Sequence, residues 1–448
     1  MAGTPLRLGV GAGFADDRIS PAAALAASGA IDYLIFECLA ERTVAREAQS
    51  RAADPEAGYN PYLVERMEAV LPDCLRHGAR IVTNMGGANP PAAARAVAAA
   101  AARIGCDPGP IATLTGDDVT EQIRARPGLR LASGRPLEEI LPRLVSANAY
   151  LGADGVAAAL ATGARIVLTG RVADPSLFVG PALHHFGWRS DDLARVAAAT
   201  LAGHLLECGA QVTGGCFADP GRKEVPGLAD LGNPIGEIDA DGGVVITKLA
   251  GTGGRIDVPV CTEQLLYEMH DPARYITPDC VLDVTGVDLG AEGPDRVRAK
   301  GARAAPPTDS YKVTVGYMDG YIGTGEVGYA GINAIARAEL AAEVVKERLH
   351  RDGHRYSEMR VDLIGMSSLH GMGPGRPEPY EVRLRIAART DCARAARAVG
   401  RETRAMHVNG PAGGGGASPP AVRAVLAADA LLLARSAVHP RVTLEGPA

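Results

Sequence analysis

Acidic and basic side chains occur at two places where a buried strand is expected to end. Glu37 directly follows the apolar run YLIF, and a low dielectric there would raise the pKa of its carboxyl group toward general acid or base use. Arg171 and Asp174 lie within TGRVADPS, where the guanidinium can hold a substrate carboxylate and Asp174 can act as acid, base or helix cap. The structural alternative is that both acids only cap the helices that follow.

Two further sets of side chains suit ion binding. His204 and Glu207 share one helical face at a spacing of i and i+3, next to Cys208, which suits either a metal ligand pair or a histidine oriented by a carboxylate. A structural pair is the alternative, and no second ligand cluster accompanies it. Lys248 and Lys312 each lie in a β-rich run, as anion anchors or as paired structural cations.

Three glycine-rich segments could present backbone N–H groups to an anion. The turn GVGAGF (9–14) has the context of a phosphate-binding turn but lacks the third glycine of the dinucleotide fingerprint, so no nicotinamide or flavin cofactor is expected. AGTGGR (250–255) and NGPAGGGG (409–416) could each bind an anion or form a tight turn or hinge. The candidate substrate-binding residues in these segments are Gly13, Gly253, Asn409, Gly413 and Gly414.

Alternating strands and helices must position these residues in the first half of the chain. The expected strands are LRLGVGAG (6–13), DYLIFE (32–37), ARIVTNMGG (79–87), IATLTGDD (111–118) and ARIVLTGR (164–171). Ala-rich helical stretches separate them, which predicts an α/β fold with a Rossmann-like parallel sheet and helical crossovers. Each strand ends in small or polar residues, for example Asn84 and Gly86 at the end of the third strand. Ligands bind outside the carboxyl ends of the strands in such sheets. We therefore expect a substrate site at that edge.

The second half differs in residue composition and pattern, which predicts a C-terminal α+β domain. Glycine turns and β-branched runs dominate it, with strands at 242–248, 311–323, 361–366 and 380–389 and a helix at 332–350. The Ala- and Leu-rich segment near 420–435 is expected to form a closing helix. The predicted domains are 1–208 and 209–448.

Composition excludes several classes of protein. The 448 residues carry 46 Lys and Arg against 52 Asp and Glu, with no basic run, which disfavours nucleic acid as a partner. No apolar stretch reaches about 18 residues and no signal sequence is evident, so no membrane partner and a cytoplasmic location are expected. The eight cysteines form no C-x-x-C pair, which favours reduced thiols.

Nine segments taken together carry a family resemblance. They are GAGFADDR (11–18), DYLIFECLAERT (32–43), IVTNMGGANP (81–90), NAYLGAD (148–154), IVLTGRVADPSLF (166–178), HLLECGAQVTGGCFADPG (204–221), ITKLAGTGG (246–254), QLLYEMHDPARYITPD (264–279) and NGPAGGGG (409–416). In this order they resemble the acyclic terpene utilisation (AtuA) family, from about residue 6 to the last expected helix.

The resemblance implies a role in acyl metabolism. The family is similar to a component of bacterial citronellol and geraniol breakdown, a route that works on branched acyl-CoA thioesters by carboxylation, hydration and carbon–carbon cleavage. Longer members carry a C-terminal ferredoxin-like domain, or are encoded beside a small protein of that type. This chain is expected to lack that domain, so such a protein is a candidate partner subunit. The resemblance assigns no catalytic residue.

The leading hypothesis is a lyase or hydratase acting on a carboxylated or CoA-linked branched substrate. Glu37 or Asp174 would handle the proton, Arg171 or Lys248 would hold the carboxylate, and loop amides would stabilise an oxyanion. The alternatives are a non-catalytic partner of an acyl-CoA carboxylase or another acyl-CoA enzyme, and a metal-dependent enzyme that uses His204 and Glu207. No resident cofactor or metal is predicted, a CoA thioester would enter as substrate, and a homo-oligomer is expected.

Overall fold

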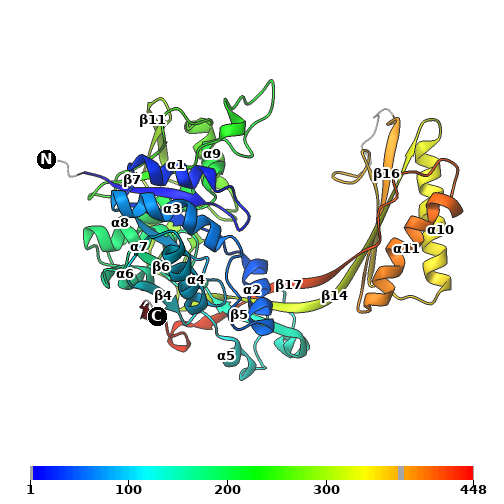
Figure 1. Cartoon of the computed structure of the whole chain (residues 1–448), viewed down its shortest axis with the longest axis horizontal. Coiled ribbons are helices and arrows are strands. Elements are labelled where there is room, and N and C mark those ends of the chain that lie inside the picture. Colours follow the sequence, from blue (N-terminus) through cyan, green and yellow to red (C-terminus); the bar gives the residue numbers. More distant parts are fainter. Residues whose placement is uncertain (1–3, 372–377, 447–448) are drawn as a thin grey trace. The chain divides into compact units, whose positions relative to one another are not determined.

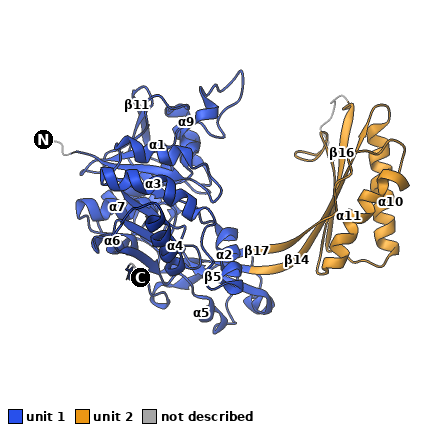
Figure 2. Ribbon diagram, viewed as in Figure 1, with its two compact units in different colours: residues 1–316, 428–448 blue, residues 317–427 orange. Residues whose placement is uncertain are grey.

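The computed structural model describes residues 4–371 and 378–446, which form two compact units (Figure 2). One unit contains residues 1–316 and 428–448, and the other contains residues 317–427. Strands β14 (Ser310–Ala330) and β17 (Ala421–Ala434) each run from one unit into the other. These limits differ from the division at residue 208, because strands that follow residue 208 complete the sheet begun by the first strands.

A mixed ten-stranded sheet forms the centre of the larger unit (Figure 1). Its parallel part has the order β1-β2-β3-β6-β4, and the other strands pair antiparallel. The parallel strands are β1 (Leu6–Ala12), β2 (Tyr33–Phe36), β3 (Arg80–Thr83), β6 (Ile166–Thr169) and β4 (Ile111–Thr115). The antiparallel strands are β7 (Pro234–Ile238), β8 (Val244–Lys248), β12 (Arg296–Lys300) and β11 (Asp288–Gly293) beside β1, and β18 (Arg441–Glu445) beside β4.

The five expected N-terminal strands are therefore confirmed, within a sheet that is mixed rather than purely parallel. All four residues of β2 and of β6 are buried, as expected when helices cover both faces of a sheet. On one face, Leu34, Phe36 and Leu168 share a core with helices α1 (Ser20–Ser28), α3 (Leu63–His77) and α4 (Pro90–Arg103). The helices α6 (Ala153–Ala161), α7 (Ser176–Phe186) and α8 (Leu193–Leu206) form a second packed group.

The remaining helices and strands complete the larger unit. The helices are α2 (Glu41–Ala53), α5 (Thr120–Arg124) and α9 (Val258–Leu266), with single 3₁₀ turns at Leu137–Glu139, Leu141–Arg143, Gly209–Thr213, Leu228–Asp230 and Arg435–Ala437. The strands are β5 (Leu144–Ala149), which pairs with β14, and a small sheet of β13 (Arg303–Ala305), β10 (Val281–Asp283) and β9 (Tyr275–Ile276).

The smaller unit is a sheet covered by two helices. Its strand order is β15-β16-β14-β17, with β15 (Glu358–Ile364) and β16 (Glu381–Thr390). Helices α10 (Ala334–Arg351) and α11 (Ala393–Asn409) pack on β16 and on each other. The segment 420–435, predicted to be helical, forms strand β17 instead, so that prediction is wrong. Pairing with β14 overrides the helical preference of its Ala and Leu residues, because tertiary contacts outweigh local propensity.

Two further findings concern membrane spans and cysteines. Within residues 4–371 and 378–446, no helix is both long and apolar enough to cross a membrane. All eight cysteines are free thiols, and four of them are buried.

Candidate active site

A cleft of about 830 Å³ lies in the larger unit, and strand ends form much of its wall. Gly13 follows β1, Glu37 follows β2, and Arg171 and Asp174 follow β6. Its volume is in the range of pockets that hold a small organic ligand. Six sequence-predicted site residues line this cleft, namely Gly13, Glu37, Arg171, Asp174, Glu207 and Lys312.

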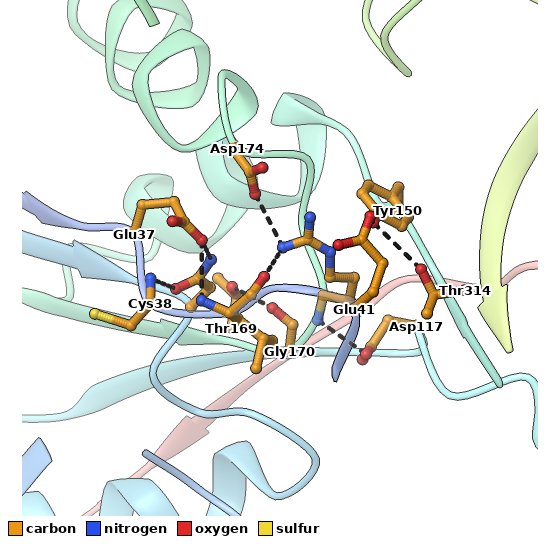
Figure 3. A network of polar contacts seen from close by, with 12 residues as sticks. Glu37, Cys38, Glu41, Asp117, Tyr150, Thr169, Gly170, Asp174 and Thr314 are labelled. Atoms are coloured by element: carbon orange, nitrogen blue, oxygen red, sulfur yellow. Dashed lines mark hydrogen bonds and ion pairs between the residues drawn. The ribbon is translucent and has the colours of Figure 1, made fainter. Parts of the chain in front are cut away.

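Glu37 is anchored through one of its two carboxyl oxygens. Its Oε1 accepts hydrogen bonds from Asn84 Nδ2 at 3.0 Å and from the Leu39 N–H at 2.9 Å. Asn84 is fully buried, and its Oδ1 accepts the Cys38 N–H at 2.7 Å, which fixes the amide's orientation (Figure 3). Among the described residues, Oε2 of Glu37 has no hydrogen-bond partner, so a proton on this carboxyl belongs on Oε2.

Burial, and to a lesser degree the neighbouring charge of Asp174, raises the pKa of Glu37 to about 8. The Arg171 guanidinium and the two hydrogen bonds to Oε1 oppose this shift but do not cancel it. At neutral pH the group is therefore a carboxylic acid, able to donate a hydrogen bond or a proton.

Arg171 is a buried cation held from several sides. Its Nη1 pairs with Asp174 Oδ1 at 2.9 Å and donates to the Leu39 carbonyl oxygen (Figure 3). Its Nε is buried with no hydrogen-bond partner among the described residues. Although burial opposes the charged form, the charge of Asp174 and other acidic groups hold the pKa of Arg171 well above its ordinary value. Arg171 is thus a permanent positive charge on the cleft wall.

Two cations lie against the aromatic ring of Tyr150. The guanidinium carbon of Arg171 is 4.1 Å from the ring centroid, and Lys312 Nζ is 4.6 Å from it. The hydroxyl donates to Glu41 Oε1 at 2.5 Å and accepts from Thr314 at 3.2 Å. Burial would raise the pKa of Glu41, but this bond and the charges of Lys312 and Arg171 lower it to about 2. One fixed anion therefore faces two fixed cations here.

Asp117 supports the strand end from behind. Its Oδ2 accepts the Arg171 N–H at 2.9 Å and Asn148 Nδ2 at 2.8 Å. Gly170 packs so closely against this carboxyl that a Cβ at its position would collide with it. Burial raises the pKa of Asp117 to about 6. The chain around Arg171 is therefore fixed by buried polar contacts.

The GVGAGF turn has a packing role in place of a phosphate site. The Gly13 N–H donates to Asp17 Oδ2 at 2.9 Å, so a carboxylate of the protein already occupies this amide. A Cβ on Gly11 would lie 2.6 Å from Cδ1 of Phe36. The glycines therefore permit close approach of β1 to its neighbours.

Several predicted site residues lie outside the cleft lining. Gly86 packs against the Thr169 carbonyl oxygen, and Gly253 against the backbone of Gly227. Lys248 is 9% exposed, its Nζ donates to the Thr252 carbonyl oxygen at 2.8 Å, and it pairs with Asp295 at 3.1 Å. These contacts give the three residues structural roles.

The loop of residues 409–416 belongs to the smaller unit. Arg337 Nη1 donates to the Ala412 carbonyl oxygen at 2.7 Å, and His407 Nδ1 lies 3.1 Å from the Gly414 carbonyl oxygen. Asn409, Gly413 and Gly414 are therefore not in the unit that contains the cleft.

His204 and Glu207 are paired, as their spacing predicts. His204 Nδ1 lies 3.2 Å from Glu207 Oε1, and His204 is fully buried. In the part of the chain that the structure describes, no three His, Cys, Asp or Glu side chains are grouped as a metal site would require.

Sequence reasoning missed Glu41 and Tyr150, which bracket Lys312. Glu41 was hidden by its place at the start of α2, where an acid normally serves the helix terminus. Tyr150 follows β5, a strand that was not predicted, and an isolated tyrosine gives no pattern. The match of NAYLGAD (148–154) to the family segments was the available signal.

The comparisons with known proteins place the chain in a family. A family model described as acyclic terpene utilisation family protein AtuA matches residues 6–444. No curated protein and no solved structure matches the chain. Because the family match covers nearly the whole sequence, both units included, the chain belongs to the acyclic terpene utilisation family AtuA.

Proposed function

We propose that the protein is an enzyme that transfers protons in lyase or hydratase chemistry on a carboxylated or CoA-linked branched acyl substrate. The observation that carries this proposal is the state of Glu37. This side chain lines the cleft beside the cation Arg171, it is a carboxylic acid at neutral pH, and its Oε2 has no hydrogen-bond partner among the described residues. Carboxyl groups kept neutral in this way donate to carbonyl oxygens on which negative charge develops.

The cations of the cleft support an anionic substrate group. Arg171 and Lys312 both lie against the Tyr150 ring, and each lines the cleft. A guanidinium binds a carboxylate more specifically than an ammonium does. Arg171 is therefore the proposed carboxylate anchor, with Lys312 as a second, more exposed attraction.

Elimination and hydration next to a carbonyl group share one requirement. Negative charge develops on the carbonyl oxygen when a bond to the carbon chain next to the carbonyl group forms or breaks. An acid must stabilise that oxygen. Glu37 would supply this stabilisation. Asp174, paired to Arg171 at 2.9 Å, would keep Glu37 protonated through its negative charge. Membership in a family named for acyclic terpene use supports a branched acyl substrate.

Turnover of a defined panel tests the proposal. Branched 2-enoyl-CoA thioesters, with and without a second carboxylate, would be incubated with wild-type protein and with Glu37→Gln. We expect turnover of at least one carboxylated thioester and a loss of about 100-fold or more in the variant. Glu56→Gln, which changes an exposed acid paired to Arg95, should retain wild-type turnover.

Two outcomes would contradict the proposal. One is a folded Glu37→Gln protein that retains full turnover. The other is turnover that occurs only after other acyl-CoA enzymes are added and does not depend on Glu37, which would favour a non-catalytic partner.

A further inference from the structure

A second acid lines the cleft and is paired with a buried histidine. Glu207 is 7% exposed and His204 is fully buried. Glu207 Oε1 lies 3.2 Å from His204 Nδ1, whereas its Oε2 is buried without a hydrogen-bond partner among the described residues. Glu207 lines the cleft, and Oε2 is the oxygen of this side chain whose hydrogen-bonding capacity is unused.

The other ring nitrogen determines where the protons lie. His204 Nε2 is 3.0 Å from the Leu265 carbonyl oxygen, which can only accept a hydrogen bond, so Nε2 carries a hydrogen. The 3.2 Å contact at Nδ1 then needs one proton, either on Nδ1 or on Glu207 Oε1. The pair therefore shares a proton and is neutral in total.

Neighbouring groups favour retention of this proton. Burial raises the pKa of Glu207 to about 7, with the charges of Asp174 and Glu268 raising it and His204 lowering it. The hydrogen bond and charge of Glu207 raise the pKa of His204, although burial opposes this. The Tyr275 ring packs on the imidazole at 5.0 Å, and Cys208 and Tyr275 both titrate above their ordinary range because of burial.

We propose that Glu207 is the catalytic base that acts with the acid Glu37 in this cleft, for a substrate with an acidic C–H next to a carbonyl group. His204 is its positioning residue. This inference rests on the proposed function. Glu207 Oε2 takes the proton, the C–H electron pair forms the enol double bond, and the carbonyl π pair accepts the Glu37 proton. In the ion-pair form the His204 imidazolium stabilises the Glu207 carboxylate before it acts.

Deuterium incorporation from D₂O into saturated branched acyl-CoA thioesters, with and without a second carboxylate, tests this role, because each carries a C–H next to the thioester carbonyl. The exchange is measured by mass spectrometry across pH. Glu207→Gln should lower the exchange rate by about 100-fold or more. His204→Gln should lower it less and move the acidic limb of the pH profile to higher pH, because Glu207 loses the neighbour that lowers its pKa. A merely structural role for His204 would leave the position of this limb unchanged.

Folding and site specificity need their own controls. Glu263→Gln changes an exposed acid of α9 that pairs with Lys223, and this variant should exchange like wild type. Imidazole ¹⁵N NMR of Glu207→Gln should show a folded protein in which His204 has a lowered pKa.

The outcomes separate the two proposals. Wild-type exchange that Glu207→Gln leaves intact would overturn the role of Glu207 while the proposed function stands. Exchange lost in Glu207→Gln but retained in Glu263→Gln supports that role. Absence of exchange in wild-type protein with every thioester would overturn both proposals.

Discussion

At the scale of single residues, the cleft is defined by acids whose environments separate their protonation states. Glu41 is hydrogen-bonded to Tyr150 and close to Lys312, and its pKa is lowered to about 2 despite burial. Burial raises the pKa of Glu37 to about 8. Such a separation is how one site holds a fixed anion and a proton donor together.

The raised pKa of Glu37 predicts a pH dependence of stability. The folded state binds this proton more tightly than the unfolded state, whose carboxyl titrates near 4.5. The contribution is therefore fully present below about pH 4.5 and is lost as pH rises through about 8. Thermal unfolding of wild type and Glu37→Gln between pH 5 and 8.5 should show wild type losing more stability with rising pH.

The variant comparison is needed because other groups share this sign. Burial also raises the pKa values of Asp117 and Asp279, each to about 6. Parallel stability curves for wild type and Glu37→Gln would show that Glu37 titrates in its ordinary range.

The residue chemistry was only partly predictable from sequence. Glu37 could be found because an acid after YLIF has few ways to avoid a low dielectric. Lys248 carries the same kind of signal, yet it is satisfied by Asp295 and a backbone carbonyl. Partners that lie far away in sequence decide between these outcomes, and a single sequence does not show them.

At the scale of elements, close packing between strands and turns positions the cleft. β1 lies against Phe36 of β2 with no room for a side chain at Gly11. The structure also explains which elements could be predicted. Short, largely apolar runs such as YLIF and IVLT are stable only as buried strands of a covered sheet. The Ala- and Leu-rich segment 421–434 suits a helix by local preference, and its pairing with β14 makes it a strand.

Substitution of one glycine tests this packing. Gly11→Ala should lower the free energy of unfolding by about 1–3 kcal/mol, because its Cβ would push on the buried Phe36 ring. Gly128→Ala is the matched control, since nothing lies within 4 Å of a Cβ there. Chemical denaturation measures both, and equal stabilities of the two variants would refute the close approach.

At the scale of the whole molecule, one compact unit contains the entire cleft. Every residue that lines it falls within 1–316 or 428–448. Sequence texture placed a boundary near residue 208, because the change from helix-rich to glycine- and β-rich sequence occurs there. Residue composition does not show that β7 and β8 join β1 in one sheet, since tertiary contacts decide which strands pair.

This organisation predicts that the smaller unit can be removed without loss of the cleft. Strands β14 and β17 are neighbours in their sheet, so residues 317–427 can be replaced by a short glycine- and serine-rich linker. The shortened protein should fold and retain thioester exchange within about tenfold of the intact chain. Cooperative unfolding by circular dichroism would check the fold, and a folded but inactive product would mean that catalysis needs the smaller unit.

The central claim is that the cleft contains a carboxylic acid, Glu37, that is neutral at physiological pH. The most direct measurement is ¹³C NMR titration of glutamate side-chain carboxyls in wild type and Glu37→Gln. We predict one resonance that titrates near pH 8 in wild type and is missing from the variant. A Glu37 resonance that titrates between pH 4 and 5 would contradict the account.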